Sequence, residues 1–140
     1  MGVLMHPNYE EEKANGVAVS RHEFGDVGNH PYYANVQLGE NLITNPDLSS
    51  RPEELLLSFQ IGTQRGINPN PIRLIASNQV PLGKVVLTDD QGNKVAQHLN
   101  AIVRHFRRLY DANSSFAMEI EFKITKEDQL IIKQARPWVH

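Results

Sequence analysis

Two segments near the C-terminal end of this 140-residue chain most constrain its fold. One runs from Phe116 to Ile124 and the other from Leu130 to Pro137, and both are rich in β-branched and aromatic residues. A short polar stretch separates them, so the pattern predicts two strands joined by a turn. Because side chains alternate between the faces of a strand, Met118, Ile120 and Phe122 share one apolar face. The sequence therefore predicts a hairpin that buries this face.

The other face of the predicted hairpin carries a compact polar set. Alternation places Glu119 and Glu121 together on the first strand, and Gln134 and Arg136 together on the second. Carboxylate oxygens are ligands that Mg²⁺ prefers, and a planar guanidinium suits phosphate oxygens. These residue types point to the binding of a nucleotide with Mg²⁺. On spacing alone, a solvated polar face of an amphipathic hairpin is the alternative interpretation.

The order of these residues resembles the end of a known domain. Glu119-Ile-Glu121, followed by Gln134-Ala-Arg136-Pro137, resembles the end of the ATP-grasp domain in the phosphoenolpyruvate synthase and pyruvate phosphate dikinase family. The resemblance implies that Glu121 and Gln134 bind Mg²⁺ and ATP, with Glu119 assisting at the metal. It implies that Arg136 contacts the transferred phosphoryl group, so that Arg136, Glu121 and Gln134 are the catalytic residues. Glu119 stands where this family often has aspartate.

Two more positions join the predicted nucleotide site through the same resemblance. The segment from Gly16 to Arg21 resembles the family's strand that ends near the nucleotide phosphates, which implies a phosphate contact for Arg21. The turn Gly39-Glu40 resembles the family's glycine–glutamate turn, which implies a nucleotide contact for Glu40.

A long amphipathic helix is predicted from Asp89 to Tyr110. Thr88 and Gln91 have the spacing of a capping box, in which each side chain satisfies the backbone N–H of the other residue. The apolar positions at helical spacing are Ala96, Leu99, Ile102, Val103, Phe106 and Leu109. Their periodicity predicts a helix that packs one face against the sheet.

The remaining strands are predicted from short apolar runs. They are expected at 2–6, 17–20, 32–37, 52–59 and 72–77. The run at 52–59 is ambiguous between one helical turn and a strand, and a strand is favoured because the sheet needs partners. The pair Asn15-Gly16 predicts a turn that leads into the second of these runs. The acidic run Glu10-Glu11-Glu12 is interpreted as part of a solvated loop.

Together these elements predict an α+β fold with a mainly antiparallel sheet and one long helix packed on it. The resemblance implies the C-terminal subdomain of an ATP-grasp domain, so residues 1–140 are expected to form a single domain that is a fragment of a longer protein. The expected missing parts are the N-terminal half of the ATP-grasp domain, a phosphohistidine domain and a domain that binds phosphoenolpyruvate or pyruvate. The fragment alone is therefore expected to be inactive.

Composition excludes several classes of partner. A net charge of −2 gives no broad attraction to nucleic acid or to an anionic membrane. There is no membrane-length apolar run and no signal-peptide pattern. The absence of cysteine excludes disulfides and weakly favours a cytoplasmic location.

The functional prediction is an ATP- and Mg²⁺-dependent phosphotransferase that passes a phosphoryl group to a carrier histidine on another domain. Two alternatives stay open: a non-catalytic binding or regulatory module, and the ATP module of a related glucan or antibiotic phosphotransferase. The final acceptor is left open because other domains select it.

Overall fold

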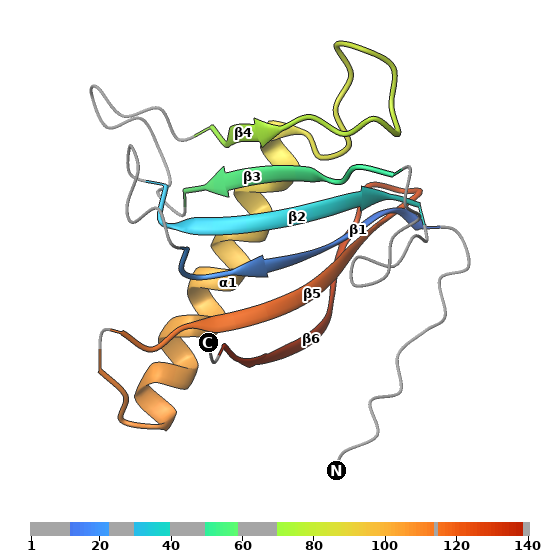
Figure 1. Cartoon of the computed structure of the whole chain (residues 1–140). Coiled ribbons are helices and arrows are strands. Elements are labelled where there is room, and N and C mark those ends of the chain that lie inside the picture. The colour runs from blue at the N-terminus through green and yellow to red at the C-terminus, as the bar shows by residue number, and fades with distance from the viewer. Residues whose placement is uncertain (1–11, 23–29, 40–49, 59–69, 114, 139–140) are drawn as a thin grey trace.

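A six-stranded antiparallel sheet with one helix on its face makes up the described part of the chain (Figure 1). The computed structural model describes residues 12–22, 30–39, 50–58, 70–113 and 115–138. The elements are β1 Glu12–Val19, β2 Tyr32–Leu38, β3 Glu53–Leu57, β4 Ile72–Ile75, α1 Asp89–Leu109, β5 Met118–Thr125 and β6 Leu130–Pro137. The strand order is β4-β3-β2-β1-β5-β6, and each neighbouring pair is antiparallel. The predicted α+β class, the long helix and the C-terminal hairpin are confirmed.

The hydrophobic core lies between α1 and one face of the sheet, with α1 running behind the strands in Figure 1. The helix contributes Val95, Ala96, Leu99 and Val103, all buried. The sheet contributes the alternate residues of its strands: Ala14, Ala18, Tyr32, Ala34, Val36, Leu55, Leu57, Met118, Ile120, Phe122 and Ile124. Leu109 is 63% exposed, so the predicted apolar face of the helix ends before its last turn.

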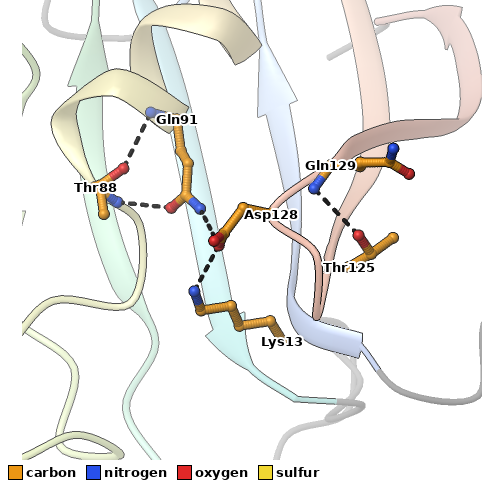
Figure 2. Close-up of polar contacts among 6 residues, drawn as sticks. All are labelled: Lys13, Thr88, Gln91, Thr125, Asp128 and Gln129. Carbon is orange, nitrogen blue, oxygen red and sulfur yellow. Dashed lines mark hydrogen bonds and ion pairs between the residues drawn. The ribbon is translucent and has the colours of Figure 1, made fainter.

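The start of α1 is hydrogen-bonded to the turn between β5 and β6, which also contacts β1 (Figure 2). Thr88 Oγ1 accepts from the backbone N–H of Gln91 at 3.2 Å, and Gln91 Oε1 accepts from the backbone N–H of Thr88 at 2.9 Å. The predicted capping box is therefore confirmed. Gln91 Nε2 also donates to Asp128 Oδ1 at 3.2 Å, in the turn between β5 and β6. Lys13 Nζ of β1 lies 2.5 Å from the same oxygen.

The turn predicted at Asn15-Gly16 is wrong, because β1 continues through both residues. Gly16 is required by close packing across the sheet. A Cβ at this position would lie 2.6 Å from Phe122 Cζ and 2.8 Å from the carbonyl oxygen of Asn35. The strand predicted at 2–6 lies outside the described residues.

A β-bulge interrupts the pairing of β5 with β6. Glu121 is opposite Gln134, whereas Phe122 is opposite Ile132, so Lys133 is the extra residue. A bulge of this kind shifts the alternation of one strand by one residue. Ile132 therefore packs against the core, whereas the side chains of Gln134 and Arg136 project from the opposite face of the sheet.

Candidate functional site

The candidate site lies on the face of the sheet that is turned away from α1, which we call the polar face. Its residues alternate with the core residues along each strand, and the register aligns them in rows across the sheet. They are Asn15, Val17 and Val19 of β1, Tyr33, Asn35 and Gln37 of β2, Glu54 and Leu56 of β3, Glu119, Glu121 and Lys123 of β5, and Gln134 and Arg136 of β6.

The register brings four of the predicted site residues together. Glu119 lies directly opposite Arg136, and Glu121 lies directly opposite Gln134. Opposed side chains in an antiparallel pair have Cβ atoms about 5 Å apart. The predicted clustering of two carboxylates, one amide and one guanidinium is therefore a feature of the folded chain.

Glu119 and Arg136 form a two-point ion pair. Arg136 Nε lies 3.3 Å from Glu119 Oε2, and Arg136 Nη2 lies 3.2 Å from Glu119 Oε1. The hydrogen bond from Arg136 to Glu119, followed by the charge of that carboxylate, raises the pKa of Arg136 above its ordinary value. The Glu119 side chain is 17% exposed and that of Arg136 is 54% exposed. The contact uses one edge of the guanidinium, so the Nη1 N–H groups remain available to an anion.

Glu121 and Gln134 form the second opposed pair, and Glu121 is half-buried whereas Gln134 is exposed. Within the described ranges, no group of three or more His, Cys, Asp or Glu side chains is placed to hold a metal ion. Mg²⁺ is, however, usually bound by one or two carboxylates, with substrate phosphates and water completing the shell. The oxygens of Glu121 and Gln134 fit that requirement, and Glu119 is already engaged by arginine.

A buried lysine on the polar face was missed by the sequence interpretation. Lys123 is 2% exposed and its Nζ lies 3.5 Å from Glu12 Oε1, while Lys133 Nζ lies 4.0 Å from the same oxygen. Glu12 is the first residue of β1 and forms ion pairs with both lysines, so the prediction that it lies in a solvated loop is wrong. A bulge between Glu12 and Ala14 turns its side chain to this face. Alternation from Glu119 and Glu121 already placed Lys123 on the same face.

A hydrogen-bonded pair occupies the β2–β3 side of the polar face. Tyr33 Oη donates to Glu54 Oε1, and Asn35 lies directly opposite Glu54. Burial, and then the Glu54 carboxylate, raise the pKa of Tyr33, whereas the Asn35 amide opposes this rise. Neither Asn35 Oδ1 nor either amide atom of Gln37 has a hydrogen-bond partner among the described residues, and all three atoms are buried.

The other predicted site residues are placed differently. Arg21 lies just beyond the end of β1, where Val19 is opposite Glu119, and its Nη1 donates to the backbone oxygen of Ser115 at 3.3 Å. No contact joins it to the four clustered residues in the described structure. Glu40 lies outside the described residues.

The polar face thus combines an arginine held in a fixed orientation, a half-buried carboxylate and several buried amides. Such a set can bind an anion through the guanidinium and a cation through oxygen atoms. Across the described ranges, α1 lacks the apolar length needed to cross a membrane. Comparisons of the chain with family models, with curated proteins and with solved structures each found no match.

Proposed function

We propose that this chain is the ATP- and Mg²⁺-binding part of a phosphotransferase of the phosphoenolpyruvate synthase and pyruvate phosphate dikinase type, with the fold of a C-terminal ATP-grasp subdomain. The complete enzyme would pass a phosphoryl group from ATP to a carrier histidine on another domain. The observation that supports the proposal is the strand register that puts Glu121 opposite Gln134 and Glu119 opposite Arg136 on one face.

In this proposal the four residues divide the work of holding a charged substrate. Glu121 and Gln134 supply oxygen ligands to Mg²⁺, and Arg136 donates its outer N–H groups to a phosphate oxygen. Glu119 positions Arg136 through the two-point contact, so the guanidinium is oriented before the nucleotide arrives. Mg²⁺, when bound there, would neutralise negative charge on the phosphate oxygens during transfer.

The proposed site is completed by groups from outside the clustered four. Mg²⁺ demands octahedral coordination, and the triphosphate needs more cations than one arginine provides. Arg21 and Glu40 are proposed further nucleotide contacts, and the rest is assigned to the other half of the ATP-grasp domain. We therefore expect the chain alone to bind ATP more weakly than about 1 μM, or about −8 kcal/mol.

Titration of the ¹⁵N-labelled chain with ATP and Mg²⁺, followed by NMR, tests the proposal. The expected result is a set of shifted amide signals in β5 and β6, which saturates at millimolar nucleotide. Glu121→Gln removes a ligand charge and Arg136→Lys removes the planar fork, so each should weaken binding about tenfold or more, as for a charged hydrogen bond of about 1.5–3 kcal/mol. Glu127→Gln, an exposed position in the β5–β6 turn, is the matched control and should bind as the unaltered chain does.

Two outcomes contradict the proposal. One is the absence of any shift at several millimolar ATP with Mg²⁺, which favours a non-catalytic α+β module. The other is binding that all three variants retain equally, since the polar pairs of β5 and β6 would then be a solvated surface. Thermal melts of each variant separate a loss of binding from a loss of folding.

A further inference from the structure

The last turns of α1 extend past β5, beyond the part of the sheet that the helix covers (Figure 1). The last buried residue of the helix is Val103, whereas the helix continues to Leu109. Leu109 is 63% exposed, and the C-cap residue Tyr110 is 55% exposed. Residues 104–110, which we call the helix end, therefore present apolar surface to solvent.

Aromatic side chains fix the position of Tyr110 within the helix end. The ring centroids of Phe106 and Tyr110 lie 5.8 Å apart, and those of Tyr110 and Phe116 lie 6.0 Å apart. Phe106 and Phe116 are themselves partly buried against the hydrophobic core. A side chain that is already held in place loses little conformational entropy when a partner covers it. Tyr110 is therefore a suitable anchor for a binding partner.

Three arginines line one side of the helix end. Arg104, Arg107 and Arg108 have i, i+3 and i+4 spacing, which places their Cβ atoms about 5–6 Å apart on one side of a helix. In the described part of the chain, none of the three forms an ion pair with a carboxylate. Arg107 Nη2 donates to the backbone oxygen of Phe116 at 3.4 Å. The negative end of the helix dipole amounts to about half a charge, so most of this positive charge is not neutralised.

The charge of this region is opposite in sign to that of the rest of the chain. Residues 104–117 contain three arginines and one acidic residue, Asp111, which gives +2. Since the whole chain carries −2, the remaining residues carry −4. The helix end can therefore attract acidic groups locally, while the rest of the chain repels extended anionic surfaces such as nucleic acid or an anionic bilayer. A second copy in a two-fold symmetric contact would place the arginines against each other.

We propose that the helix end is a docking surface for an acidic amphipathic helix of a protein partner. Carboxylates at i and i+4 of the partner helix pair with Arg104 and Arg108, because both pairs of side chains have the same spacing. An apolar side chain beside them packs on Leu109 and Tyr110. Arginine and tyrosine are enriched at the centres of protein interfaces. This inference is independent of the proposed nucleotide site, which lies on the polar face, turned away from α1.

The probe is a synthetic helical peptide with glutamates at i, i+4 and i+7 and leucines beside them. The control peptide has glutamine in place of each glutamate. Each is titrated into the ¹⁵N-labelled chain and followed by NMR. The acidic peptide should shift the amide signals of the helix end with a dissociation constant below about 1 mM, and the glutamine peptide should bind at least about tenfold more weakly. Added salt should weaken only the acidic peptide, because it screens exposed charges.

Variants of the chain locate the contact. Arg104→Glu combined with Arg108→Glu should weaken binding of the acidic peptide at least about tenfold. The same double variant should bind a peptide with lysine in place of glutamate more tightly than the unaltered chain does. The matched control, Lys84→Glu combined with Lys126→Glu, makes the same charge change at exposed positions elsewhere and should bind as the unaltered chain does.

Leu109→Ala tests the apolar part of the surface. It removes an exposed side chain, so folding should be unaffected, and binding of the acidic peptide should weaken about threefold or more. Thermal melts show whether each variant folds. If the double arginine variant does not fold, Leu109→Ala and the glutamine peptide decide, and unchanged binding in both overturns the proposal.

Several other results would overturn the proposal. They are the absence of shifts at several millimolar acidic peptide, shifts confined to other parts of the chain, and equal binding of the acidic and glutamine peptides. Vesicles of phosphatidylcholine and phosphatidylserine test a membrane as the occupant: co-sedimentation that the double arginine variant loses, without peptide binding, would assign the surface to lipid. Broadening of the same amide signals as the chain is concentrated without peptide would assign it to a second copy.

Discussion

Gly16 of β1 packs closely against both neighbouring strands, β2 and β5. Its φ is outside the left-handed region, so an alanine is compatible with the backbone, and the obstacle is contact with neighbouring atoms. Replacing glycine by alanine restricts the unfolded chain and by itself stabilises by about 0.4–1 kcal/mol. Overpacking costs about 1–3 kcal/mol, and one of the two clashing atoms is a backbone oxygen that cannot rotate away. The clash should therefore exceed the entropic gain.

We expect Gly16→Ala to lower the free energy of unfolding by about 1–2 kcal/mol, measured by urea denaturation. The double variant with Phe122→Leu tests the cause, since a smaller side chain removes the contact with the ring. The two changes should then be less destabilising together than the sum of their separate effects, by about 0.5 kcal/mol or more. A Gly16→Ala variant as stable as the unaltered chain would contradict this account of the glycine.

At the scale of elements, the link between α1 and the β5–β6 turn joins a local motif to a distant one. Gln91 belongs to the capping box and also donates to Asp128, which Lys13 of β1 contacts as well. Asp128 has a φ of 63°, a conformation that aspartate accepts more readily than most residues. Fixing the turn against the helix start therefore stabilises both.

Thr88→Ala should cost about 1 kcal/mol of stability, as for the loss of an N-cap. In a double-mutant cycle, Gln91→Ala and Asp128→Ala should be coupled by about 0.5 kcal/mol or more, because they share one hydrogen bond. Lys94→Ala is the control on the same helix. Its pair with Asp90 is exposed and worth about 0.3–0.5 kcal/mol. Additive effects of Gln91→Ala and Asp128→Ala would show that the link does not stabilise the fold.

The helix and the hairpin could be predicted from the sequence because their signals are local. The capping box of Thr88 and Gln91 and the 3.6-residue periodicity need no knowledge of distant residues. The prediction of a turn at Asn15-Gly16 was wrong. The local preference of these residues favours a turn, but β1 lies between β2 and β5 and forms hydrogen-bonded pairs with each. Tertiary pairing there overrides the local signal.

In the candidate site, too, the contacts within one strand could be predicted and those between distant strands could not. Alternation within single strands predicted that Glu119 and Glu121 lie together, and that Gln134 and Arg136 do. The ion pair of Glu12 with Lys123 could not be predicted, because it depends on the register of β1 against β5 and on a bulge. The hydrogen bond of Tyr33 with Glu54 likewise depends on which strand neighbours β2.

At the scale of the whole molecule, alkaline pH should reduce stability partly through Tyr32. Burial raises the pKa of Tyr32 from 10.0 to about 12, against the opposing charges of Arg107 and Arg104. Its hydroxyl donates to Asn100 Oδ1 at 3.1 Å. Above about pH 10 the unfolded chain loses the phenolic proton and the folded chain keeps it. The contribution is therefore fully present below pH 10 and lost as the pH rises to about 12.

Because one pKa unit is about 1.4 kcal/mol, Tyr32 should account for about 2–3 kcal/mol of that loss at most. Urea unfolding between pH 8 and about pH 12 measures it. Tyr32→Phe should flatten the decline, whereas Tyr110→Phe, at an exposed tyrosine, should leave the slope unchanged. The same slope in Tyr32→Phe as in the unaltered chain would show that Tyr32 ionises equally in both states.

The extra residue of β6, Lys133, lets this strand lose one residue without exchanging its faces. Without Lys133, Ile132 would still be opposite Phe122 and Gln134 opposite Glu121, so strict alternation would keep Ile132 toward α1 and Gln134 and Arg136 on the polar face. Removing a residue between Gln134 and Arg136 would instead turn Arg136 toward α1. Evolution of this segment would thus accept a loss of length at the bulge and resist one beyond it.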